Sequence, residues 1–236
     1  MFIFLRLLLS HFIADFPLQV SKVYELKLKK AWGSFVHSGI VVLVCIVMNI
    51  PFLHRPQIWV VILWIWLIHG LQDWLKVTYC EKVKKDNLWI FMLDQMLHIA
   101  LISVVFLIPK LNFTSIPHGN SLLLRIYNND TLVIYLMGYI FGCFGGIFVN
   151  LYMKEALLKI PFEEIPNGRV KWLAILERAL IMTSVLACGY WLLLIPLVWV
   201  VKILMTKKRE KIFYVDLVIN TIIAVVVGGI VWFVLH

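Results

Sequence analysis

Long apolar runs dominate this sequence and limit the folds that are open to it. Hydrophobic residues make up 62% of the 236-residue chain, whereas ordinary soluble domains are about 45–50% apolar. A helix needs roughly 20 apolar residues to cross a bilayer. Because the runs are continuous rather than alternating, they favour helices over the strands of a closed barrel. The sequence therefore predicts an all-α integral membrane protein, a polytopic bundle of transmembrane helices.

About eight of these runs have a length suited to a membrane span. The sixth and seventh are the shortest, and Gly189 and Pro196 interrupt their shared run, which predicts a short hairpin or a re-entrant segment. The spans divide the chain into a four-helix half at 1–109, an external loop at 110–130 and a four-helix half at 131–236. The predicted spans cover residues 2–20, 32–52, 58–76, 88–109, 131–152, 172–188, 190–206 and 213–235.

Basic residues are distributed unevenly among the connections between these spans. Most of the 22 lysine and arginine residues follow the first, third, fifth and seventh spans, and the other connections carry only Arg55, Lys110 and Arg125. Because cytoplasmic connections are the ones enriched in lysine and arginine, both termini are predicted to lie outside the cytoplasm. This topology explains the net charge of +9, so we expect the lipid bilayer, and no nucleic acid, as a partner.

Seven ionisable side chains interrupt the apolar runs of the first four spans. Histidine and aspartate occur four residues apart three times, and residues at this spacing share a helix face. Their order is reversed in the fourth span, which runs opposite to the third, so each aspartate stays nearer the cytoplasm. At a rise of about 1.5 Å per residue, all seven fall at one depth, in the cytoplasmic third of the membrane. They are His11, Asp15, His37, His69, Asp73, Asp94 and His98.

Ionisable groups inside a membrane are costly and are functional by default. Separate interhelical contacts are one explanation for them, but seven groups at one depth favour a shared site. Imidazole and carboxylate without thiolate are ligands of a divalent metal, with zinc first and Mn, Fe, Co and Ni as alternatives. Either two metals are bound, or one metal is surrounded by groups that orient its ligands. A metal would explain how three carboxylates stay ionised in lipid, whereas without one we would expect a proton relay.

We interpret this centre as that of a metal-dependent hydrolase or transferase acting on a lipid-like or amphiphilic substrate at the cytoplasmic leaflet. A metal lowers the pKa of its bound water and polarises a carbonyl or phosphoryl oxygen. A carboxylate outside the coordination shell, Asp15 or Asp73, would be the catalytic base. Two alternatives use the same residues: a carrier for metal ions or protons, and a binding or scaffold protein whose metal is structural.

Charged residues near the cytoplasmic ends of the sixth and seventh spans form a second feature. Glu177, Arg178 and Lys202 are predicted to bind the anionic part of a substrate, since arginine and lysine bind phosphate and carboxylate. The alternative is an internal salt bridge between Glu177 and Lys202 across the predicted hairpin.

A third feature is the smooth helix face that glycines spaced by four form in the fifth span. Such faces allow helices to approach each other closely. This face predicts close packing, either within the chain or in an oligomer. The glycines are Gly138, Gly142 and Gly146.

The motifs of the first four spans resemble those of DUF3307, a family of uncharacterised bacterial multi-span membrane proteins. The second half is similar to that family around Leu176-Glu177-Arg178 and near Lys202 and Tyr214. The resemblance implies a protein of the bacterial cytoplasmic membrane and implies no activity. As a pattern, the layout is also similar to that of membrane-bound metal-dependent hydrolases. The matching motifs are His11-Phe-Ile-Ala-Asp15-Phe-Pro-Leu-Gln19, Lys22, His37, His69-x-x-x-Asp73-Trp-Leu-Lys76 and Asp94-Gln95-x-x-His98.

Overall fold

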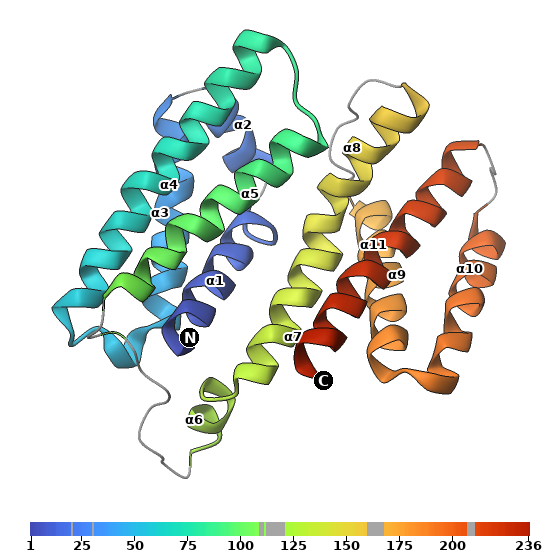
Figure 1. Ribbon diagram of the computed structural model, residues 1–236. Helices are drawn as coiled ribbons and strands as arrows, with labels where there is room; N and C mark the ends of the chain where they lie inside the picture. The colour runs from blue at the N-terminus through green and yellow to red at the C-terminus, as the bar shows by residue number, and fades with distance from the viewer. Residues whose placement is uncertain (20, 30, 109–110, 112–120, 160–167, 207–210) are drawn as a thin grey trace. The chain divides into compact units, whose positions relative to one another are not determined.

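The chain forms helices in two compact units. Within the described residues it contains no β-strand, as the apolar runs predict. The units are Met1–Met137 and Gly138–His236, and Figure 1 labels their helices. The computed structural model describes residues 1–19, 21–29, 31–108, 111, 121–159, 168–206 and 211–236.

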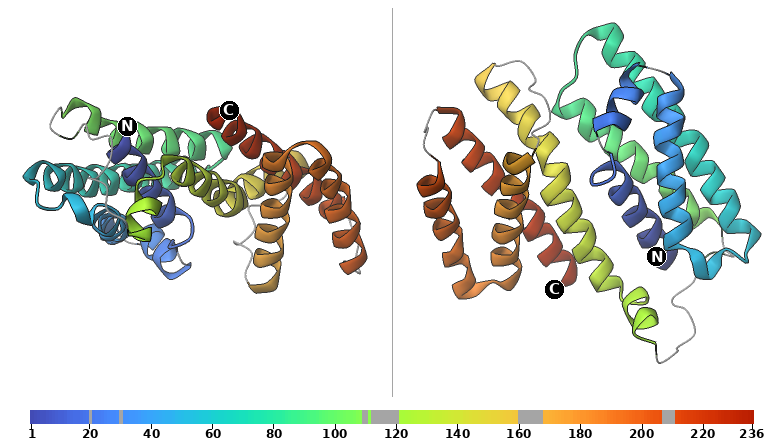
Figure 2. Two further views of the ribbon diagram at one scale, coloured as in Figure 1. Left: turned by 90° about the horizontal axis from the view of Figure 1, so that it is seen from below. Right: turned by 180° about the vertical axis from the view of Figure 1, so that it is seen from behind.

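The unit Met1–Met137 is a helix bundle around one apolar core. Its elements are α1 (Phe2–Asp15), α2 (Ser21–Lys29), α3 (Ala31–Met48), η1 (Ile50–Phe52), α4 (Pro56–Val83), α5 (Leu88–Ile102), η2 (Ser103–Leu107) and α6 (Leu122–Tyr127). α3 packs against α1, α2 and α4, while α5 packs against α4 and α1 (Figure 2). Phe2, Leu7, Val41, Ile62 and Ile102 are among the buried core side chains. Burial of this apolar surface places the first four predicted spans side by side.

Local sequence signals fix several ends of these helices. α5 begins after Asn87, whose Oδ1 accepts a hydrogen bond from the backbone N–H of Ile90 at 3.0 Å, as a helix N-cap does. α4 carries Pro56 at its first turn and ends before Lys84, whose backbone is left-handed. α1 ends at Asp15 rather than at residue 20, because Pro17 has no backbone N–H with which to continue the helical hydrogen bonds.

The unit Gly138–His236 forms a second helical core. α7 (Asp130–Ile140) reaches into it and continues through the π-helix η4 (Phe141–Gly145) into α8 (Gly146–Leu158). The remaining elements are α9 (Gly168–Ala187), η5 (Gly189–Leu193), α10 (Leu194–Met205) and α11 (Lys211–Leu235). α11 packs against α8 and α9. Ile147, Ile181, Met182 and Ala224 are among the buried residues of this core.

Residues 172–206 form two helices joined by a turn. Cys188 and Gly189 both have positive φ, 58° and 57°, a conformation that glycine adopts freely. α9 and α10 pack against each other across this turn, and Figure 2 shows them as a hairpin. Pro196 lies inside the first turn of α10, where its missing N–H is not needed. Gly189 therefore breaks the apolar run, and Pro196 does not.

The glycine face of the fifth predicted span is covered within the unit Gly138–His236. A Cβ added at Gly138 would overlap the Val231 side chain of α11, and one at Gly142 would overlap the Met182 sulfur of α9. A Cβ at Gly146 would also lie in tight contact with both of these helices. The glycine face was predicted to pack either within the chain or in an oligomer, and the structure shows packing within the chain.

The described helices differ in whether they are long and apolar enough to cross a membrane. Each of the eight predicted spans contains a helix, but within the described ranges four helical segments are long and apolar enough to cross a membrane. The apolar segments Trp32–Met48 and Gly189–Met205 are shorter. The four long segments are Pro56–Val83, Leu88–Leu107, Asp130–Leu158 and Lys211–Leu235.

Parts of the predicted connections lie outside the described residues. In the predicted external loop at 110–130, α6 is described, but residues 110 and 112–120 are not. Residues 30, 160–167 and 207–210 of the predicted cytoplasmic connections also lie outside the described ranges, as do residues 20 and 109 at the ends of two predicted spans.

The contact between α2 and the start of α3 yields a testable prediction. A Cβ at Gly33 would overlap the backbone carbonyl of Leu26, whereas a Cβ at Gly39 in the same helix meets nothing within 4 Å. We expect Gly33→Ala to lower the free energy of unfolding by about 1–3 kcal/mol, the usual cost of overpacking. Gly39→Ala should leave it unchanged or raised. Equal unfolding midpoints for both variants in detergent would contradict this packing.

Candidate metal centre

Seven ionisable side chains from four helices meet inside the unit Met1–Met137. Each exposes at most 8% of its surface. Because histidine and aspartate lie four residues apart on α1, α4 and α5, each of these helices turns one polar pair toward the interior. The predicted convergence is therefore present. The side chains are His11 and Asp15 from α1, His37 from α3, His69 and Asp73 from α4, and Asp94 and His98 from α5.

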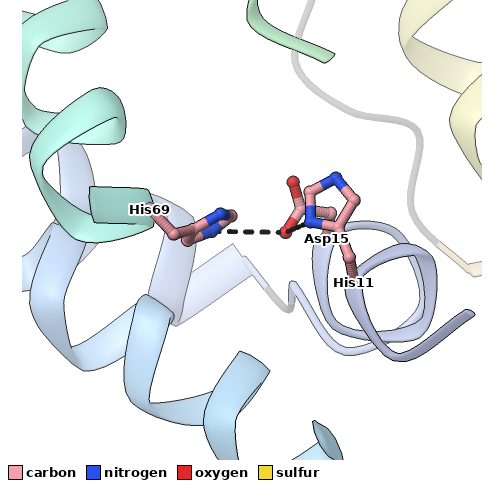
Figure 3. Close-up of side chains that lie close together, drawn as sticks. All are labelled: His11, Asp15 and His69. Carbon is pink, nitrogen blue, oxygen red and sulfur yellow. Dashed lines mark ion pairs between the residues drawn. The ribbon is translucent and has the colours of Figure 1, made fainter. Parts of the chain in front are cut away.

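One oxygen of Asp15 is surrounded by imidazole nitrogens. Its Oδ1 lies 3.1 Å from His37 Nε2, 3.5 Å from His11 Nδ1 and 3.6 Å from His69 Nε2. Figure 3 shows His11 on the same helix as Asp15 and His69 approaching from another helix. Three nitrogens from three helices thus face a single carboxylate oxygen.

Asp73 lies opposite Asp15 and faces two of the same nitrogens. Its Oδ2 is 3.7 Å from His69 Nε2 and 3.8 Å from His37 Nε2. Ligands held about 2.0–2.1 Å from a tetrahedral zinc ion lie roughly 3.3 Å apart. The four separations of 3.1–3.8 Å are close to that value. We call Asp15, His37, His69 and Asp73 the central quartet, and each of its carboxylate oxygens lies at a separation from both imidazole nitrogens that suits ligands of one ion.

Several atoms of the cluster are buried without a hydrogen bond to any described residue. They include both ring nitrogens of His11, Nε2 of His69 and His98, and Oδ2 of Asp73. Most buried polar atoms in proteins have a hydrogen-bond partner. Two acceptors in direct contact do not satisfy each other. A cation between the nitrogen lone pairs and the carboxylate oxygens would satisfy all of these atoms together.

The ring of His98 is held in a form suited to binding a cation. Its Nδ1 donates a hydrogen bond to the backbone carbonyl of Asp94 at 2.8 Å, because a carbonyl oxygen only accepts. In the neutral ring, Nε2 then carries the lone pair. That nitrogen lies 3.9 Å from Asp73 Oδ1, so two acceptors face each other across a gap in which a cation would be favourable.

The four imidazole rings lie close together. Ring centroids lie 4.1 Å apart for His69 and His98, 5.0 Å for His11 and His98, and 5.4 Å for His37 and His69. Histidines from four helices therefore share one small volume, as ligands of a common ion must.

Two lysines that sequence reasoning assigned to cytoplasmic connections reach this cluster. Lys27 Nζ of α2 lies 2.6 Å from Asp73 Oδ1, and Lys76 Nζ of α4 lies 3.2 Å from Asp94 Oδ2. Two of the three carboxylates that a metal was expected to keep ionised, Asp73 and Asp94, therefore also have an ammonium group beside them. Lys76 follows Asp73 by three residues, and this spacing places it on the same helix face as the polar pair, so its contact with the cluster could have been predicted. The long-range partner of Lys27 left no local signal.

The unit Gly138–His236 contains its own partly buried ionic network. Lys202 Nζ of α10 lies 2.6 Å from Glu177 Oε2 of α9 and 3.0 Å from Asp216 Oδ2 of α11. Asn220 donates a hydrogen bond to the same Glu177 oxygen at 3.0 Å. The internal salt bridge between Glu177 and Lys202, one of the two predicted alternatives, is therefore present.

Arg178 is buried beside this network and contacts neutral acceptors. Its Nη1 donates to Asn220 Oδ1 and its Nη2 to the backbone carbonyl of Cys143 in the π-helix, both at 2.6 Å. Only 1% of the Arg178 surface is exposed. The structure thus joins Glu177 and Lys202 directly and links Arg178 to them through Asn220. Substrate binding by these three residues stays a prediction.

Comparison with known proteins gives a family and no named relative. The sequence model of DUF3307, a family described as proteins of unknown function, matches residues 3–124. That range contains all seven residues of the buried His/Asp cluster. No curated protein and no solved structure matches the chain.

The ionic network of the unit Gly138–His236 generates a stability prediction. Glu177→Gln would remove one charge from a contact with Lys202 whose carboxylate side is 4% exposed. We expect a loss of about 2 kcal/mol in the free energy of unfolding, because a buried charge-assisted contact is broken. The exposed Glu81 provides the control, since Glu81→Gln should change stability little. Equal unfolding curves for both variants would show that the pair adds nothing.

Proposed function

We propose that this chain, which belongs to the DUF3307 family, is an integral protein of a bacterial cytoplasmic membrane with eight spans and both termini outside. Four helical segments long and apolar enough to cross a membrane support the membrane location. The unequal distribution of lysine and arginine supports the orientation, because cytoplasmic connections are enriched in these residues. Under this topology the buried cluster lies near the cytoplasmic leaflet.

The cluster is proposed to bind a divalent metal, with zinc first and Mn, Fe, Co or Ni as alternatives. The observation that carries this proposal is the set of four separations between 3.1 and 3.8 Å in the central quartet. Two imidazoles and two carboxylates are borderline-to-hard ligands that suit these ions. The unpaired buried nitrogens and oxygens around them supply further support.

We assign the bound metal to hydrolysis or group transfer on a lipid-like or amphiphilic substrate. A metal in this position would lower the pKa of a bound water and polarise a substrate oxygen. Asp73 is the preferred base of the two candidates, because its separations from His69 and His37, 3.7 and 3.8 Å, are longer than those of Asp15 from the same two rings. Catalytic zinc sites keep three protein ligands and leave the fourth position to a water. We therefore assign Asp15, His37 and His69 as the ligands during catalysis, with Asp73 giving up its place in the quartet to a water and acting on it as the base.

A carrier for metal ions or protons is the second candidate function. One observation favours it: each of three potential ligand groups shares a residue with the next. His69 belongs to the first and second groups, and Asp73 belongs to the second and third. Such a series would let an ion pass from one group to the next. The groups are His11–Asp15–His69, His37–His69–Asp73 and Asp73–Asp94–His98.

Metal content is the first test of the proposal. We expect purified protein, or apoprotein supplied with zinc, to retain a stoichiometric amount of metal after gel filtration. His69→Ala should lower metal affinity at least about tenfold, since one of four ligands is lost. His54→Ala is the matched control, because His54 is exposed and lies outside the cluster. Elemental analysis decides, and metal-free wild type after zinc loading would refute the metal centre.

Turnover separates the enzyme from the carrier. Protein in nanodiscs of bacterial polar lipids should convert a lipid or added amphiphile into a product detected by mass spectrometry. Chelation should stop the reaction and zinc should restore it, while Asp73→Asn should slow it by about 100-fold or more, as expected for loss of a general base.

Metal uptake into proteoliposomes that His69→Ala abolishes, with no metal-dependent product in any lipid mixture tested, would instead support the carrier.

A further inference from the structure

We propose that Lys27 and Lys76 take the place of a second metal ion, so that the buried cluster binds one metal and not two. This inference rests on the proposed metal centre and fixes its stoichiometry. The amino groups of both lysines contact carboxylates of a second potential ligand group beside the central quartet.

That second group consists of Asp73, Asp94 and His98, whose ligand atoms lie within 4.8 Å of one another. Asp73 belongs to both groups. Its Oδ2 faces the nitrogens of the central quartet, while its Oδ1 lies 3.9 Å from His98 Nε2. In two-metal sites the ions lie about 3.5–4 Å apart. Asp73 is therefore placed as a carboxylate that would bridge two ions, with one oxygen for each.

Ammonium groups already contact the two carboxylates that the second ion would use. Lys27 Nζ lies 2.6 Å from Asp73 Oδ1, and Lys76 Nζ lies 3.2 Å from Asp94 Oδ2. The side chains of Lys27 and Lys76 are 9% and 19% exposed. An ammonium is a compact point charge with three donors, so it can replace a cation between carboxylates.

The charge balance points the same way. Lys27 and Lys76 compensate Asp73 and Asp94, whereas the Asp15 carboxylate has contacts with imidazoles but no ion pair with a lysine or arginine among the described residues. With neutral imidazoles, the three carboxylates and two ammonium groups carry a net charge of −1, which one divalent ion in the central quartet would change to +1. A second divalent ion would raise the net charge to +3 in an apolar interior, which is unfavourable.

The packing of α2 keeps Lys27 in this position. α2 contacts both α3 and α4, and its fit against Gly33 leaves no room for a side chain. Lys76 follows Asp73 on α4 itself. Both ammonium groups are therefore held by the helical framework and do not depend on a loop.

The test is a cobalt(II) titration of detergent-solubilised apoprotein, followed by elemental analysis and by electron paramagnetic resonance. Wild type should bind one equivalent, with the signal of an isolated ion. The double variant Lys27→Met/Lys76→Met should bind two equivalents, because two buried carboxylates lose their ammonium groups and become free, together with His98 Nε2, to bind an ion. Magnetic coupling between the two ions should weaken or abolish the isolated-ion signal.

The control variant is Lys22→Met/Lys82→Met. It makes the same chemical changes at exposed positions of the same two helices, and it should bind one equivalent. Should the double variant not be stable enough to purify, Lys27→Met alone is titrated, and a second equivalent is again expected.

The outcomes separate this inference from the proposed function. Wild type that binds no cobalt would overturn the metal centre itself. Wild type that binds two ions would overturn the inference and keep the metal centre. A folded Lys27→Met/Lys76→Met variant, or a folded Lys27→Met variant, that binds only one equivalent would also overturn the inference.

Discussion

Burial of three carboxylates in an apolar interior is the constraint on which the unit Met1–Met137 depends. An ionised group taken out of water is tolerated only when cations or hydrogen-bond donors compensate it. Two of the carboxylates, Asp73 and Asp94, contact lysine ammonium groups, and Asp15 contacts three imidazoles. The helices that carry these groups are held by the apolar core around them. The packing of the bundle thus creates the site, and a cation in it would relieve the cost of the packing.

The local pattern of the sequence predicted that the seven side chains converge, for a physical reason. A spacing of four residues places His11 beside Asp15 and His69 beside Asp73 on one helix face, and burial in a common core brings those faces together. The apolar runs likewise predicted a helical chain, although within the described residues only four helical segments are both long and apolar enough to cross a membrane. Helices are local structures, so their positions can be read from local sequence.

Contacts between residues far apart in the chain could not be predicted in this way. Lys27 pairs with Asp73 across two helices, and its position in a polar segment pointed to a solvated connection. Arg6 is similar: it is 1% exposed and pairs with Asp130, more than a hundred residues away. Both are cations whose partners are set by tertiary packing. The stoichiometry of the proposed metal centre depends on such a contact, so sequence reasoning left one and two metals open.

The unit Gly138–His236 also has carboxylates in its interior, but its described ionic network contains no histidine. There Lys202 contacts both Glu177 and Asp216, so carboxylates and ammonium group compensate one another. This contrast favours the unit Met1–Met137 as the chemical centre. X-ray absorption of zinc-loaded protein would show whether the imidazoles and carboxylates of the central quartet bind the ion. We expect nitrogen and oxygen ligands at about 2.0–2.1 Å, with scattering from two imidazoles and none from sulfur. A spectrum of hydrated zinc without imidazole, or one with sulfur ligands, would contradict it.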